Sequence, residues 1–149
     1  VALRRDLGFL QTFLYKIASE NVSREANELT EEALCYFAWN RTSKDIPPFM
    51  QTLKRDGWES WALLIKDECA IRRKPHRLAE LLQDLDSDEQ LDMLDTIAQS
   101  RRASDIPPLL LHMEREGVSQ LVEPLLKRVS EFRESKYSSV LEAWQLAKR

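Results

Sequence analysis

Glycine, cysteine and histidine are scarce in this chain, and each shortage excludes a class of site. Three glycines in 149 residues leave no glycine-rich loop of the kind that holds phosphate groups against a helix. Two cysteines, Cys35 and Cys69, are too few for a disulfide scaffold or a zinc site. The histidines, His76 and His112, have no cysteine or carboxylate around them at metal-ligand spacing. We therefore expect no cofactor, no metal and no catalytic residue, although the parent protein can still be an enzyme.

Long apolar runs and an excess of positive charge are also missing. The apolar stretches last only a few residues, so we expect no membrane-spanning segment. A formal net charge of -3 argues against a domain devoted to nucleic acid, which usually carries a basic excess. The first residues are charged and lack the apolar region of a signal peptide, and the missing initial methionine indicates a fragment of a longer protein. A cytoplasmic location fits best, with a nuclear one left open.

Helix-forming and charged residues are abundant. Hydrophobic residues make up 43% of the chain and charged residues 32%, which is typical of a globular protein with solvent-facing helices. Apolar residues recur at spacings of three and four along most of the chain, and few residues are β-branched. The composition and the spacing together predict an all-α fold.

An internal repeat is the most informative pattern in the sequence. Residues 45–57 match residues 105–117, with Asp, Ile, Pro, Pro, Arg and Gly identical, six of thirteen positions. The prolines suit a first helical turn, whose amides have no intrahelical carbonyl to bond. The glycines, Gly57 and Gly117, can adopt the left-handed conformation that ends a helix. Each copy is thus predicted to form a helix, a tight turn and a second helix.

The remaining helices are predicted from apolar stripes and from residues that favour helix starts. We expect a first helix over residues 3–19 and a second one capped by Thr30 and ending near Trp39. Asp45 is expected at the N-cap of the first repeated helix, and a kink or restart is expected at Pro124. Ser138 or Ser139 is expected to cap the last helix.

Asp86 and Glu89 have the spacing of a capping box, which opens a helix expected to bury Leu91, Leu94, Ile97 and Ala98. The total is about nine or ten helices. Pro75 and the charge run before it mark a boundary between two similar antiparallel helical bundles, residues 1–74 and residues 75–149, packed together.

Two charge clusters flank this boundary. The basic patch consists of Arg72, Arg73, Lys74 and Arg77, and the acidic patch of Asp84, Asp86, Asp88 and Glu89. The basic patch could contact RNA phosphates or a nuclear import receptor, or be a solvated linker. Patches of opposite sign suit head-to-tail association between copies, while intramolecular pairing or simple solubility are the alternatives.

Tryptophan is the remaining candidate for a contact residue. Four tryptophans lie on or near apolar stripes, where most such residues belong to the core. Trp58 follows a turn glycine directly, so for this residue a partly exposed interface anchor is the alternative to a place in the core.

The repeated segments resemble the caspase-recruitment (CARD) branch of the death-fold superfamily. The resemblance is carried by residues 49–61, FMQTLKRDGWESW, and residues 109–121, LLLHMEREGVSQL. Both show that branch's run of an apolar helix, a basic residue, a glycine turn and a further apolar helix. A tandem pair of such modules is similar to the N-terminal region of RIG-like antiviral RNA helicases and their nematode Dicer-related relatives. The resemblance covers about a third of each half.

The resemblance implies a non-catalytic module for homotypic protein–protein interaction in intracellular signalling, innate immunity or RNA surveillance. Its partner would be another death-fold domain or a second copy of the chain, with no role for a membrane and none expected for nucleic acid. Two alternatives remain: an α-helical repeat scaffold that binds a peptide or protein, and a weak RNA-binding helical domain.

Overall fold

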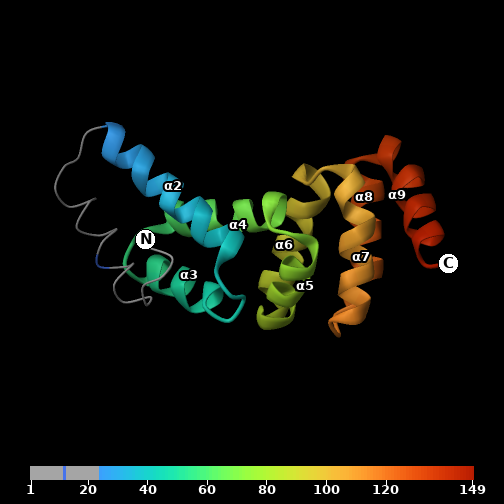
Figure 1. The fold of residues 1–149 in the computed structure, drawn as a ribbon, viewed down its shortest axis with the longest axis horizontal. Helices are drawn as coiled ribbons and strands as arrows, with labels where there is room; N and C mark the ends of the chain where they lie inside the picture. The colour runs from blue at the N-terminus through green and yellow to red at the C-terminus, as the bar shows by residue number, and fades with distance from the viewer. Residues whose placement is uncertain (1–11, 13–23) are drawn as a thin grey trace. The chain divides into compact units, whose positions relative to one another are not determined.

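The computed structural model describes residue 12 and residues 24–149, and in this part of the chain all regular structure is helical (Figure 1). The α-helices are α2 (Arg24–Asn40), α3 (Ile46–Arg55), α4 (Glu59–Arg72), α5 (Pro75–Asp84), α6 (Ser87–Ser100), α7 (Ile106–Arg115), α8 (Val122–Phe132) and α9 (Glu134–Ala147). Two 3-10 helices, η2 (Ala103–Asp105) and η3 (Ser119–Leu121), precede α7 and α8. The all-α prediction is confirmed, while the helix expected over residues 3–19 lies outside the described residues apart from Thr12.

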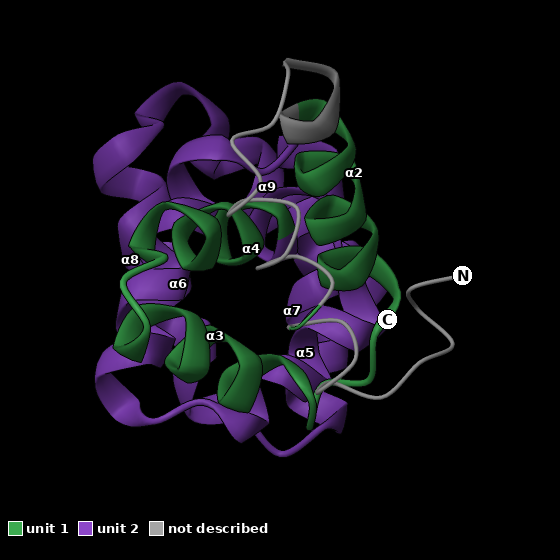
Figure 2. Ribbon diagram, turned by 90° about the vertical axis from the view of Figure 1, so that its left-hand side faces the viewer, with its two compact units in different colours: residues 1–68 green, residues 69–149 purple. Residues whose placement is uncertain are grey.

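The chain divides into two compact units, residues 1–68 and residues 69–149 (Figure 2). The division falls within α4, between Glu68 and Cys69. The boundary expected between Lys74 and Pro75 falls at the link between α4 and α5, and it stays a prediction, as does the pair of bundles. No helix of the described residues has the length and apolar character needed to span a membrane.

In the first unit, two contacts join α2 to the helices that follow it. The rings of Phe37 on α2 and Phe49 on α3 lie 4.7 Å apart between centroids. The Trp39 indole Nε1 donates a hydrogen bond of 2.9 Å to Glu68 Oε2 on α4. Helix α2 therefore contacts α3 through apolar rings and α4 through a hydrogen bond.

In the second unit, helices pack against the helix two positions along the chain. α5 packs against α7 and α7 against α9, while α6 packs against α8, which also contacts α9. Successive helices of this unit therefore alternate between two rows, α5, α7 and α9 in one and α6 and α8 in the other (Figure 1).

The internal repeat is longer in the structure than in the sequence. Its period of sixty residues relates α2, α3, α4 and α5 to α6, α7, α8 and α9. For example, α2 ends at Asn40, and α6 ends sixty residues later at Ser100. Equivalent positions are buried in both copies even where the residue differs. The pairs include Leu34/Leu94, Phe37/Ile97, Ala38/Ala98, Ile65/Leu125 and Cys69/Val129. The helix positions therefore repeat over four helices, whereas the buried positions repeat over the first three, where burial has been retained although identity has not.

The repeated helices start and end at the predicted residues, but the predicted side-chain cap of α3 is not formed. Gly57 and Gly117 have φ of 87° and 82°, and the amide after each donates back to a carbonyl five residues earlier. The prolines occupy the first turns of α3 and α7. Asp45 stands at the N-cap of α3, but its side chain makes no cap hydrogen bond and instead accepts from Arg41 Nε at 2.8 Å.

Other helix starts give a mixed outcome. The capping box of α6 is confirmed, since the Asp86 carboxylate accepts a 2.8 Å hydrogen bond from the Glu89 amide. The restart near Pro124 is confirmed too, because α8 begins at Val122 and places this proline in its first turn. The expected caps at Thr30 and at Ser138 or Ser139 are wrong, since these residues lie inside α2 and α9.

Candidate functional site

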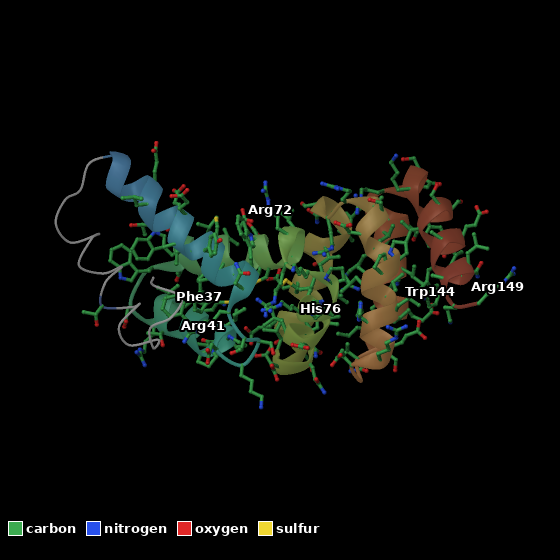
Figure 3. All side chains as sticks on the ribbon, in the orientation of Figure 1. Phe37, Arg41, Arg72, His76, Trp144 and Arg149 are labelled. Carbon is green, nitrogen blue, oxygen red and sulfur yellow. The ribbon has the colours of Figure 1, made fainter. Side chains whose placement is uncertain are left out.

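The basic patch is only partly on the surface. Arg72, the last residue of α4, is exposed (Figure 3), as is Lys74 at the N-cap of α5, and Arg77 is half-buried in the first turn of α5. Arg73 is only 1% exposed, and its Nε donates a 3.2 Å hydrogen bond to the carbonyl of Arg77. Burial lowers the pKa of Arg73. Its expected role as a surface contact is therefore corrected, because its guanidinium is part of the interior of the α4–α5 link.

The acidic patch lies at the other end of α5. Asp84 ends that helix and is exposed, and so are Asp86 and Asp88 at the start of α6, while Glu89 is half-buried. A helix of ten residues is about 15 Å long. Within the second unit, the exposed basic residues and the acidic patch therefore occupy opposite ends of one short helix.

Trp58 belongs to a stacked pair. Its ring lies 4.5 Å from that of Trp61 between centroids, with only 13° between the planes, and both side chains are half-buried. Stacking of this kind adds to the stability gained by burial alone. The partial exposure is compatible with an anchor, but its use as one stays a prediction.

Arg101 is a buried residue that sequence reasoning missed. It is 1% exposed at the end of α6, and its two terminal nitrogens donate hydrogen bonds of 2.9 and 2.7 Å to the carbonyls of Ala70 and Arg73. Its Nε is buried without a hydrogen-bond partner. Burial lowers the pKa of this guanidinium, and the nearby Asp105 carboxylate partly opposes that shift. The sequence gives no direct signal for this burial, since arginine normally lies on the surface.

A second arginine caps α6 in a related way. Arg133 is half-buried between α8 and α9, and its Nε donates a 2.6 Å hydrogen bond to the carbonyl of Ala98, in the last turn of α6. Desolvation lowers the pKa of this residue as well. Arginines therefore satisfy carbonyls near the C-terminal ends of both α4 and α6, which have no intrahelical partners.

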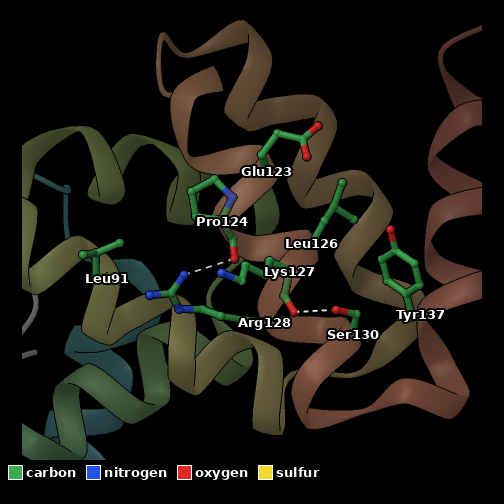
Figure 4. Close-up of a pocket in the computed structure, with 8 residues that line it drawn as sticks. All are labelled: Leu91, Glu123, Pro124, Leu126, Lys127, Arg128, Ser130 and Tyr137. Carbon is green, nitrogen blue, oxygen red and sulfur yellow. Dashed lines mark hydrogen bonds between the residues drawn. The ribbon is translucent and has the colours of Figure 1, made fainter.

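A groove runs between α6, α8 and α9 (Figure 4). Its lining residues are Leu91, Glu123, Pro124, Leu126, Lys127, Arg128, Ser130 and Tyr137. Arg128 is held in place, because its Nε lies 2.6 Å from Asp95 Oδ1 and its terminal nitrogen donates to the carbonyl of Pro124 at 3.1 Å. Leu91 was expected in the core but is 40% exposed beside this groove. We name this surface the α6–α8 groove.

A second groove, more polar, lies between the end of α4 and the link from α6 to α7. It is lined by Ile71, Arg72, Ser100, Arg102 and Asp105. Arg72 and Arg102 are exposed, whereas Asp105 is half-buried. We name this surface the arginine groove.

The histidines come together in the structure without forming a metal site. The rings of His76 and His112 lie 5.8 Å apart between centroids. In the described part of the chain, no group of three or more His, Cys, Asp or Glu residues could hold a metal ion.

Comparison with known proteins identifies no relative: no family model, no curated protein and no solved structure matches the chain.

Proposed function

We propose that this chain is a non-catalytic protein–protein interaction module whose copies associate head to tail through the two ends of α5. The observation that carries the proposal is the exposure of Arg72 and Lys74 at one end of α5 and of the acidic patch at the other. The resemblance to CARD modules points in the same direction, and it makes a larger intracellular signalling or RNA-surveillance protein the proposed parent. Complementary charges of this kind favour fast and specific association between copies.

The same charges also have a local role in the chain. Arg72 lies at the C-terminal end of α4, and Asp88 and Glu89 lie in the first turn of α6, so each complements the dipole of its own helix. Lys74 stands at the N-cap of α5, where the positive end of that helix disfavours a cation. Asp84 ends α5, where the dipole of that helix disfavours a carboxylate. The dipole of α5 therefore opposes both charges, which makes Lys74 and Asp84 good probes of association.

A second candidate function, a repeat scaffold that binds a peptide or protein, is favoured by the α6–α8 groove and by the two rows of helices. Rows in which each helix packs on the helix two positions along are typical of stacked helical repeats. The groove sets apolar side chains, including Leu91 and Tyr137, beside the charged Lys127 and Glu123, a mixture suited to an amphipathic ligand.

The test of self-association uses a pair of complementary variants. Copy A carries Arg72→Glu with Lys74→Glu, and copy B carries Asp84→Lys with Asp88→Lys. Each copy alone should associate about a hundredfold more weakly than the natural chain, because like charges then meet across the interface. An equimolar mixture should regain association, measured by sedimentation velocity.

The control is Lys136→Glu with Glu142→Lys, a reversal of exposed charges on α9 that should leave association unchanged. Asp86 is kept in every variant because it caps α6. Copies A and B that are folded by circular dichroism and still self-associate like the natural chain would contradict the proposal. If the chain is monomeric throughout but a peptide protects Tyr137 from iodination, the repeat scaffold is the better account.

A further inference from the structure

The two histidines of the chain lie side by side at one end of α5. His76, the second residue of α5, is exposed (Figure 3), whereas His112 lies in the last turn of α7 and is half-buried. The two helices pack against each other, and the ring centroids are 5.8 Å apart. Because His76 follows Lys74 by two positions, the histidine pair belongs to the basic end of α5.

The histidine pair has no ionised partner among the described residues, although carboxylates lie one turn away on both helices. Within this part of the chain, the two rings contact each other but form no hydrogen bond and no ion pair. Glu80 lies one turn after His76, and its carboxylate is close enough to Arg73 to oppose the lowering of the Arg73 pKa by burial. Glu116, one turn after His112, is half-buried at the C-cap of α7.

Several cations lie near the histidine pair along the chain. Lys74 is exposed at the N-cap of α5, and Arg115 is exposed three positions after His112. The link between α4 and α5 and the first turn of α5 add Arg72, Arg73 and Arg77. The end of α5 that carries the histidine pair is therefore the end that head-to-tail association turns toward the carboxylates of another copy.

The charged group by which α7 contacts α9 lies away from the histidine pair. Glu114 is two positions from His112 and therefore on the opposite side of α7. It accepts a 2.9 Å hydrogen bond from Trp144 Nε1 and forms a 3.8 Å ion pair with Lys148.

The charged groups of the other elements around α7 also have separate places. Asp105 of η2 lies near Arg101, and η3 carries no charged residue. On α8, Arg128 pairs with Asp95 at 2.6 Å. The other acidic and basic side chains of α8 and α9 are exposed: Glu123, Lys127, Glu131, Glu134, Lys136 and Glu142.

A carboxylate from outside the chain would make a protonated histidine pair favourable. Protonation of both rings places two positive charges close together, and like charges at this distance repel each other. A carboxylate against the rings offsets the repulsion and accepts hydrogen bonds, because both nitrogens of a protonated imidazole are donors. The acidic patch of the same copy is too far away, since it lies at the other end of α5, about 15 Å along the helix.

We propose that the His76–His112 pair binds a carboxylate of the acidic patch of a second copy, so that association strengthens as the pH falls. The inference rests on the proposed head-to-tail association and adds a titrating contact to its basic end. A bound carboxylate favours the charged form of the rings, so association takes up protons and is linked to low pH. Histidine ordinarily changes its charge between about pH 5 and 8, whereas carboxylates ordinarily titrate at about pH 4.

The test measures self-association by sedimentation equilibrium at about pH 7.5 and about pH 6.0, with EDTA present so that no metal ion bridges the rings. The natural chain should associate about tenfold more tightly at the lower pH, within the roughly thirtyfold that uptake of one proton over this range allows. His76→Gln with His112→Gln should remove the dependence. Association at the higher pH should persist in this double variant, because the neutral amide resembles the unprotonated ring.

Single substitutions guard against a double variant that fails to fold. His76→Gln, at an exposed position, should lose about half of the pH dependence on a logarithmic scale. His76→Lys should tighten association at about pH 7.5, since it supplies a permanent positive charge. The matched control is Gln145→His, which adds a titrating ring at an exposed position of α9 and should behave like the natural chain.

The outcomes separate this proposal from the one on which it rests. Association of the natural chain that is equally strong at both pH values would overturn the role of the histidine pair and leave head-to-tail association standing. Full pH dependence in a folded double variant would do the same, because the titrating group would then be the terminal amine or a thiol. A chain that stays monomeric at both pH values would overturn both proposals.

Discussion

Arg101 carries a positive charge in the protein interior, where charged groups are rare. The C-terminal end of α4 stabilises this buried guanidinium. The carbonyls of Ala70 and Arg73 close the end of α4, where four backbone acceptors lack an intrahelical donor and the dipole is negative. One side chain thereby satisfies two of the acceptors that α4 and its link expose. The residue ties the end of α6 to the end of α4 within the second unit.

Replacing Arg101 with methionine should therefore be strongly destabilising. The substitution keeps the apolar part of the side chain but leaves two buried carbonyls without a donor, at a cost of about 3 kcal/mol in the free energy of unfolding. Urea denaturation followed by circular dichroism measures the loss. Arg102→Gln, one residue away and exposed, should change stability by less than about 0.5 kcal/mol. Equal effects of the two substitutions would show that the buried hydrogen bonds do not support the fold.

The residue-scale surprises could not have been read from the chain. Arg41 and Arg101 occupy the same position of the repeat, yet Arg41 pairs with Asp45 at 2.8 Å while Arg101 bonds only carbonyls. Arg73 looked like one more member of a basic run and is buried. An arginine in such a run is buried when carbonyls of helices distant in sequence lie close enough to accept its hydrogen bonds. The local composition of the sequence does not predict where those carbonyls lie.

At the scale of helices, the ends were predictable where backbone geometry demands a particular residue. Prolines opened α3 and α7, because the first turn is the part of a helix that tolerates a residue without an amide hydrogen. Glycines closed both helices, because few other residues adopt a positive φ. Polar caps were less reliable. Thr30, Ser138 and Ser139 favour helix starts, but each costs only a few tenths of a kcal/mol inside a helix, so packing elsewhere overrides the preference.

Asp86 is the cap for which sequence and structure agree, and its contribution can be isolated. Asp86→Ala should lower the free energy of unfolding by about 1 kcal/mol, since the Glu89 amide loses its acceptor at the start of α6. Asp86→Asn should retain most of that stability, because its amide oxygen can accept the same bond. Asp84→Ala, two residues earlier and exposed, is the control and should be nearly neutral. Thermal unfolding by calorimetry ranks the three variants.

At the scale of the whole molecule, the short sequence match was a sample of a longer repeat. Only residues 45–57 and residues 105–117 retain clear identity, whereas the buried pairs at the same offset extend from α2 to α8. Cores tolerate exchange between Phe37 and Ile97 or between Cys69 and Val129, so burial survives after identity has faded. The turn residues lack that tolerance, which explains why the repeat was visible there and not elsewhere.

Salt dependence distinguishes association through the charged patches from contact through the apolar side chains of the α6–α8 groove. Association through Arg72, Lys74 and the acidic patch joins exposed charges, which salt screens over a Debye length of about 10 Å at 0.1 M. Raising the salt concentration from about 0.05 to 0.5 M should therefore weaken self-association by about tenfold or more, measured by sedimentation equilibrium. Contact through the α6–α8 groove buries apolar side chains such as Leu91 and should hold or strengthen under the same change.

The α9 charge-reversal control should show the same salt dependence as the natural chain, since its overall charge is unchanged. Copy A mixed with copy B should show it too, because the mixture restores opposite charges across the contact. Self-association that persists undiminished at high salt would place the contact on apolar surface instead. Leu91→Asp, which puts a charge into the α6–α8 groove, would then be expected to abolish it.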